Sequence, residues 1–134
     1  MDTAYTPEQE AFRVGLRHYL SERYDQGFTR TRWNEAVPHT GDMWSKFVEL
    51  GITALLIPED RGGLGMEMTD MGVVMEELGR RVNVAPVLAS CVAATSLAVR
   101  VDDVEHLARL CDGSAIATVA FEEEGAGLDR KSVV

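Results

Sequence analysis

Apolar residues recur at helical spacing along most of this chain, and the pattern is clear in its first segment. Leu16 and Leu20 belong to an apolar stripe whose opposite face is charged or polar, which predicts an amphipathic helix over residues 6–24. Thr6 is placed to cap this helix, and Gln9, three residues later, completes a capping box. Local chemistry alone therefore sets the start of the first helix.

The same spacing continues after an interruption. Residues 25–41 lack an apolar stripe, so we expect an irregular connection in which Trp33 serves as an anchor. Gly51 is expected to end the second helix in the left-handed conformation. In the third helix, Glu76 and Glu77 are expected to point away from the apolar stripe. The four helices expected after this interruption lie at residues 42–50, 69–79, 86–99 and 102–111.

The pattern changes near the end of the chain. Residues 115–121 are short and apolar, without helical periodicity, which predicts a strand that is buried on both faces. One strand cannot satisfy its own backbone hydrogen bonds, so the rest of its sheet is expected to lie outside this sequence. The predicted fold class is therefore mainly α, with about five helices and one terminal β-strand from an otherwise missing β domain.

Charge and hydropathy narrow the range of partners. The chain has 134 residues, a formal charge of −9 and an isoelectric point near 4.7. Nucleic acids and anionic membrane surfaces require a basic face, so neither is an expected partner. Residues 82–99 carry no charge, but they include Pro86 and many small or hydroxyl side chains. This composition favours a central helix buried in protein over a membrane span.

Few residues in the helical part suggest chemistry. Cys91 and Cys111 form no CxxC pair, so we expect two buried, reduced thiols and a cytoplasmic location. The three histidines lie far apart in sequence without ligand spacing, so no metal site is expected. The loop from Gly62 to Gly65 lacks the spacing of a phosphate-binding loop, and we expect it to be a tight connection between closely packed helices.

Two motifs in this order resemble one enzyme family. Residues 58–65 read Pro-Glu-Asp-Arg-Gly-Gly-Leu-Gly, and residues 76–80 read Glu-Glu-Leu-Gly-Arg. The pattern resembles the N-terminal helical domain of the acyl-CoA dehydrogenases, flavoenzymes that remove two hydrogens from the α and β carbons of an acyl thioester. The resemblance implies an orthogonal helical bundle over residues 1–113. It also implies that residues 114–134 are the first strand and loop of an incomplete middle β domain.

The resemblance continues beyond the predicted strand. Residues 122–129 read Glu-Glu-Glu-Gly-Ala-Gly-Leu-Asp, where the family has Thr-Glu-Pro-Gly-Ala-Gly-Ser-Asp beside the flavin ring and the thioester. Leu128 is thereby implied to meet the substrate. Glu122 stands where the family has a hydroxyl residue, and an ionised carboxylate cannot donate a hydrogen bond to the flavin. Flavin binding by this chain alone is therefore doubtful. The contacts to FAD implied by the resemblance are Glu122, Glu123, Gly125, Ala126 and Gly127.

The helix expected at 86–99 is the best candidate for a binding surface inside the chain. Its small side chains leave room for a neighbour to approach closely. In the resembling enzymes, helices that follow the Glu-Glu-Leu-Gly-Arg motif help to wall the acyl-chain pocket. Ordinary helix packing is the competing interpretation for each position. The residues implied to line this wall are Leu88, Cys91, Val92 and Thr95.

The resemblance also implies what the chain contributes to a complete enzyme. In this family a glutamate of a later C-terminal domain removes the α proton, and the flavin accepts the β hydride. This chain is therefore expected to hold no catalytic residue, to be inactive alone, and to supply pocket wall and oligomer contacts. The alternative is a non-catalytic subunit or interaction module of a heteromeric acyl-CoA dehydrogenase, which Glu122 and Leu128 would suit. The expected partners are acyl-CoA and either further copies of the chain or a related subunit.

Overall fold

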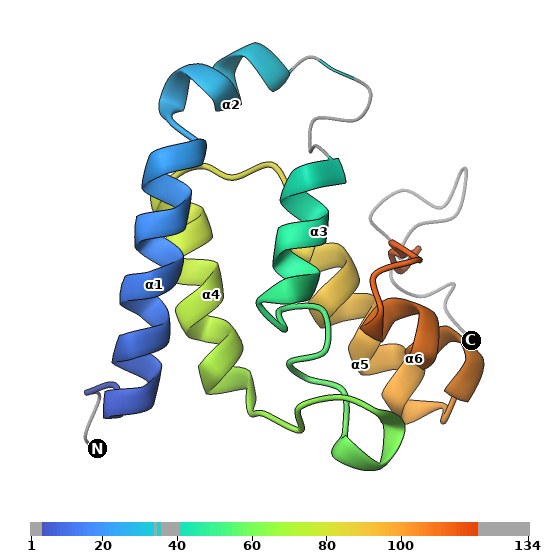
Figure 1. The fold of residues 1–134 in the computed structure, drawn as a ribbon. Coiled ribbons are helices and arrows are strands. Elements are labelled where there is room, and N and C mark those ends of the chain that lie inside the picture. The colour runs from blue at the N-terminus through green and yellow to red at the C-terminus, as the bar shows by residue number, and fades with distance from the viewer. Residues whose placement is uncertain (1–3, 34, 36–40, 121–134) are drawn as a thin grey trace, which may run out of the picture.

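The described part of the chain is helical throughout its regular secondary structure. The computed structural model describes residues 4–33, 35 and 41–120 (Figure 1). This confirms the mainly α class for the residues described, while the orthogonal arrangement stays a prediction. The α-helices are α1 (Pro7–Arg23), α2 (Gln26–Arg32), α3 (Gly41–Glu49), α4 (Met68–Arg80), α5 (Thr95–Arg100) and α6 (Val104–Cys111). A 3₁₀ turn, η1 (Glu59–Arg61), precedes α4, and a π-helix, η2 (Leu88–Ala94), leads directly into α5.

Helices α1 and α4 lie side by side and run in the same direction (Figure 1). Gln9 of α1 donates a hydrogen bond to Asp70 at the start of α4, and Arg17 bonds to Glu77 two turns further along both helices. Helix α3 runs in the opposite direction, and α5 packs against α6 on the far side of α3. Helix α4 is thus placed centrally, with different neighbours on its two sides.

Local signals set the helix boundaries as expected. The Thr6 hydroxyl accepts the Gln9 amide at 3.2 Å, and the Gln9 side chain accepts the Thr6 amide at 3.0 Å, which confirms the capping box. Gly51 follows α3 with a φ of +76°, as predicted. In the glycine loop, a Cβ added to Gly63 would lie 2.0 Å from the carbonyl oxygen of Ile57. Only glycine allows this approach, so the loop is the tight connection that was expected.

Two apolar clusters hold the helices together. The larger joins α1, α3, α4 and η2, and its fully buried side chains include Leu16, Phe47 and Val74. Complete burial of a side chain of this size contributes about 1.5–3 kcal/mol. The smaller cluster joins Ile57 to α5 and α6, with Leu107 at its centre. The chain therefore packs as a larger helical layer with a smaller one beside it.

The segment expected to be irregular contains a helix instead. Asp25 caps α2 by accepting the Phe28 amide at 2.7 Å, and the Phe28 ring packs edge-on against Tyr24 at 5.0 Å. The Thr29 side chain is buried. Trp33 is 65% exposed, so its predicted role as an anchor is wrong. The anchoring is done by the Tyr24–Phe28 pair, which lies at the start of the segment rather than in its middle.

The last described segment has no strand partner among the described residues. Residues 115–120 form neither a helix nor a sheet ladder, and their side chains alternate between half-buried and exposed. Ile116 is 43% exposed, so burial on both faces is not achieved in these residues. Because a strand needs a neighbour for its backbone hydrogen bonds, the strand itself stays a prediction. In the ranges described, no helix is both long and apolar enough to cross a membrane.

Candidate functional site

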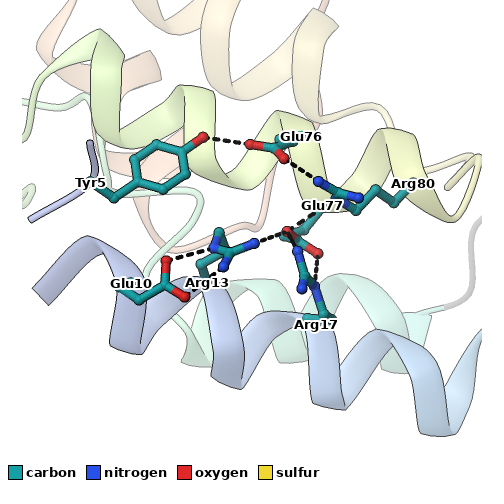
Figure 2. Close-up of polar contacts among 7 residues, drawn as sticks. All are labelled: Tyr5, Glu10, Arg13, Arg17, Glu76, Glu77 and Arg80. Carbon is teal, nitrogen blue, oxygen red and sulfur yellow. Dashed lines mark hydrogen bonds and ion pairs between the residues drawn. The ribbon is translucent and has the colours of Figure 1, made fainter. Parts of the chain in front are cut away.

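The Glu-Glu-Leu-Gly-Arg motif lies in the last turns of α4, facing α1. Charged and polar side chains of the two helices, together with Tyr5 just before α1, form a continuous network there (Figure 2). We call this network the charged seam. Its members are Tyr5, Glu10, Arg13, Arg17, Glu76, Glu77 and Arg80.

Glu77 is the centre of the charged seam. Its side chain is 1% exposed, and Arg17 donates two hydrogen bonds to its carboxylate at 2.8 and 2.7 Å. Arg13 and Arg80 lie 3.6 and 3.4 Å from the same carboxylate. The hydrogen bond from Arg17 and the charges of the arginines hold the pKa of Glu77 below its usual value, although burial acts in the opposite direction. Glu77 therefore lies off the apolar stripe of α4, as expected, but its side of the helix is buried as well because α1 covers it.

The remaining members of the charged seam are also paired within the network. Glu10 pairs with Arg13, and Glu76 receives hydrogen bonds from both Tyr5 and Arg80. Each carboxylate of the seam thus has a cationic partner within the chain. Such a neutral, mutually bonded cluster offers little to a charged ligand, but it fixes α1 beside α4. The seam is a structural element by this geometry.

A groove of about 590 Å³ lies at the C-terminal end of α4, and we call it the α4 groove. Trp33, Val82 and Leu88 on its lining are 65%, 54% and 61% exposed. Exposed apolar side chains gathered in one hollow are typical of binding surfaces. The complete lining is Trp33, Met75, Leu78, Gly79, Val82, Asn83, Val84, Ala85, Val87 and Leu88.

A strained turn shapes this groove. Val82 has a φ of +50°, a left-handed conformation that β-branched residues rarely adopt and that costs about 1–3 kcal/mol. The turn is held by the Val82 and Asn83 amides, which donate to carbonyl oxygens of α4 at 3.0 and 2.9 Å. The Asn83 side chain then accepts the Ala85 amide at 2.9 Å. These bonds bring Leu88 back beside the end of α4.

The four residues predicted to line the wall of the acyl pocket differ in how exposed they are. Leu88 lines the α4 groove, and Val92 is half-buried one turn further along η2. Cys91 and Thr95 are 2% and 1% exposed, and both face the protein interior. Burial raises the pKa of the Cys91 thiol to about 12. The role of these four residues in an acyl pocket stays a prediction, with Leu88 the one whose side chain is open to a ligand.

The residues predicted to contact flavin lie outside the described residues. Glu122, Glu123, Gly125, Ala126, Gly127 and Leu128 are all in that part of the chain. Over residues 4–33, 35 and 41–120, no buried side-chain nitrogen or oxygen lacks a hydrogen-bond partner. In the same ranges, no three potential ligands gather that could hold a metal ion.

Sequence reasoning missed most of the α4 groove. Trp33, Met75 and Val82 come from three separate segments, and no spacing in the sequence relates them. A second groove of about 550 Å³ lies between the start of α1 and the glycine loop, where Phe12, Leu55 and Leu64 contribute apolar surface. None of the residues predicted for binding lines this second groove. The α4 groove is therefore the better candidate site.

Comparisons with known proteins agree with the two motifs. The sequence profile of a family described as acyl-CoA dehydrogenase, N-terminal domain, matches residues 6–102. Acyl-CoA dehydrogenase IpdE2 of Mycolicibacterium smegmatis is 31% identical over 118 residues, which are 87% of this chain and 38% of that protein. Acyl-CoA dehydrogenase IpdE2 of Mycobacterium tuberculosis is 36% identical over 84 residues, or 61% of this chain and 26% of that protein. Acyl-CoA dehydrogenase FadE28 of the same organism is 33% identical over 88 residues, or 63% and 26%.

The matched range contains both motifs and nearly all of the described helices. It includes Glu77 at the centre of the charged seam and Leu88 on the α4 groove. The chain spans 38% of the length of the first relative and 26% of the other two. Because the family profile covers more than half of the chain, the chain belongs to the acyl-CoA dehydrogenase family and contains its N-terminal domain.

Proposed function

We propose that this chain is the N-terminal helical part of a flavin-dependent acyl-CoA dehydrogenase, and that the α4 groove contributes to the wall around the acyl chain. The observation that carries the proposal is the position of Leu88. It is exposed, it lines an apolar groove, and it follows the family motif on α4. An apolar lining suits a hydrocarbon chain, because each buried methylene contributes about 0.8 kcal/mol.

The part of this chain in the proposed reaction is to bind and orient. The apolar side chains of the groove exclude water from the acyl chain and limit its length and shape. Dehydrogenation of a thioester also needs a hydride acceptor, a chemistry that FAD supplies when it is bound. We propose FAD contacts at Glu122, Glu123, Gly125, Ala126 and Gly127 and a substrate contact at Leu128. No catalytic residue is proposed in this chain.

We also propose that further copies of the chain, or a related subunit, are its protein partners. Support comes from the apolar side chains that the described residues leave exposed, which include Trp33, Val101 and Ile116. Of these, Trp33 lies with the exposed Val82 and Leu88 on the α4 groove, and apolar surface gathered in this way is typical of interfaces between proteins. The three relatives described above are named acyl-CoA dehydrogenases, which supports acyl-CoA as the small-molecule partner.

The test fills the groove in the full-length product of the gene. Leu88→Trp adds bulk at the lining, so we expect kcat/KM to fall about tenfold for the longest acyl-CoA substrates and little for the shortest. The matched control is Leu97→Trp, because Leu97 is 45% exposed on α5 and is not part of the groove lining. An equal loss at every chain length would contradict the pocket role. A wild-type protein that oxidises no acyl-CoA would contradict the proposed function as a whole.

A further inference from the structure

Buried side chains from distant segments donate hydrogen bonds to the backbone at the end of α6 and just after it. The Trp44 indole of α3 donates a hydrogen bond to the carbonyl oxygen of Gly113 at 3.1 Å. The Thr53 hydroxyl donates to the carbonyl oxygen of Cys111 at 2.9 Å. Trp44 and Thr53 are 6% and 2% exposed, so the donor side chain of each bond is buried. The direction in which the chain leaves the helical layer is therefore fixed at two successive points.

A third hydrogen bond to the segment after α6 comes from the π-helix η2. The Ala117 amide donates to the hydroxyl oxygen of Ser90 at 3.3 Å, and Ser90 is 1% exposed. Ala117 packs against the smaller apolar cluster, whereas Cys91, the neighbour of Ser90, belongs to the larger one. This one bond therefore joins the two clusters. It also acts on an extended segment that has no strand neighbour among the described residues to set its register.

The backbone around Ser90 is unusual. Helix η2 is a π-helix of 7 residues, a form that is rare and occurs often at functional sites. Its wider turn leaves the Ser90 carbonyl oxygen facing Thr95, whose buried hydroxyl donates to it at 3.0 Å. Thr95 thus holds the main chain of Ser90, while the side chain of Ser90 holds Ala117. Leu88 of the α4 groove stands on the same π-helix, two residues before Ser90.

We propose that Ser90 is a positioning residue that sets residues 115–120 at a fixed place relative to the α4 groove. The inference rests on the proposed function, because the sequence that follows residue 120 contains the contacts proposed for FAD. The groove and residues 115–120 are then both attached to one short helix, η2. A shift of the π-helix would move the α4 groove and residues 115–120 together. Loss of the Ser90 hydroxyl would remove the bond that holds residues 115–120 in place relative to the groove.

The first measurement is amide hydrogen exchange in the full-length wild-type protein and in Ser90→Ala. Loss of the acceptor should speed exchange in residues 115–120 about five- to tenfold, with the larger apolar cluster unchanged. Ser96→Ala is the matched control, because it removes an exposed hydroxyl from the adjoining helix α5. Ser90→Cys, with a weak acceptor of similar size, replaces Ser90→Ala if circular dichroism shows that the latter loses helix content.

The second measurement reads out positioning rather than packing. In Ser90→Ala we expect the dissociation constant for FAD to rise several-fold and the visible flavin band to shift. We expect kcat to fall roughly tenfold while KM for acyl-CoA stays within about twofold, because the groove itself is unchanged. Ser96→Ala should match the wild type in every readout.

The possible outcomes test the positioning role of Ser90 separately from the proposed function of the chain. Faster exchange together with altered FAD binding supports the inference. Unchanged exchange, or faster exchange with unchanged FAD binding and unchanged kinetics, overturns the inference and leaves the proposed function standing. A wild-type protein that binds no FAD overturns the proposed function, and the inference falls with it.

Discussion

Helix α4 presents two faces of opposite character. Toward α1 it carries Glu77, whose carboxylate is buried and held by arginines from both helices (Figure 2). Toward η2 it carries Met75 and Leu78, which line a groove that remains open. The first face buries charge that arginines satisfy. The second face packs Leu78 into the larger apolar cluster and borders a groove whose exposed apolar side chains, Trp33, Val82 and Leu88, come from outside α4.

The difference separates stability from binding. A buried carboxylate is tolerated only when hydrogen-bonding cations surround it, so the charged seam can accept little change and mainly fixes the position of α4. The exposed side chains of the α4 groove, such as Trp33 and Leu88, contribute little to folding, so they can change with little effect on stability. The charged residues of the family motif thus lie on the face of α4 that packs against α1. The binding role that we propose belongs to the other face.

The largest expected effect comes from Glu77→Gln at the charged seam. The amide cannot neutralise the arginines, so we expect a loss of about 2 kcal/mol in the free energy of unfolding. The expected loss is smaller than for a fully buried ion pair, because Arg17 and Arg80 are 40% and 53% exposed and can be hydrated when the carboxylate is lost. Urea unfolding measures it. Glu76→Gln, at a partly exposed carboxylate, should cost clearly less than Glu77→Gln, and equal losses in the two variants would contradict the central role of Glu77.

A smaller effect is expected from acid. The pKa values of Glu10, Glu76 and Glu77 are all lowered in the folded protein, by Arg13, by Tyr5 with Arg80, and by Arg17 respectively. The unfolded chain therefore binds more protons than the folded chain below the ordinary pKa of 4.5. Stability should be complete above this pH and fall as the pH drops further. Urea midpoints across this range measure the loss, which should be shallower in Glu77→Gln; identical slopes would show that Glu77 contributes nothing to the pH dependence.

The smallest effect on stability is expected at the α4 groove. Replacing Trp33 and Leu88 together by serine should change the free energy of unfolding by less than about 1 kcal/mol, because both side chains are mostly exposed. The same variant should lower self-association. We expect the wild-type chain to form a dimer or larger assembly at micromolar concentration, and the variant to shift toward monomer in light scattering. A monomeric wild-type chain would remove this role for the groove.

Features with a local cause could be predicted from the sequence. The capping box at Thr6 and Gln9 and the left-handed Gly51 depend on residues a few positions apart, and both are present. The start of α2 has a similar local signal, since Asp25 precedes Phe28 by three residues, but the segment has no apolar stripe and was expected to be irregular. Periodicity alone was too narrow a criterion for a helix of 7 residues.

Features with a distant cause could not be predicted. Glu77 is buried because Arg17 lies 60 residues earlier on the neighbouring helix, and no pattern around Glu77 reveals this. The α4 groove depends on a valine in the left-handed conformation, which its side chain disfavours and which the surrounding hydrogen bonds impose. Of the predicted wall residues, Leu88 lies at an open surface, while Cys91 of the same helix and Thr95 at the start of α5 are interior positions.

The burial of Cys91 also affects how the protein responds to thiol reagents. Alkylating and oxidising agents react with the thiolate, and a thiol with a pKa of about 12 in a 2% exposed side chain is almost entirely protonated and shielded. Cys91 can therefore react only when η2 separates from the larger apolar cluster. Its modification rate therefore measures how often that core opens, and the measurement is made on the helix that borders the groove.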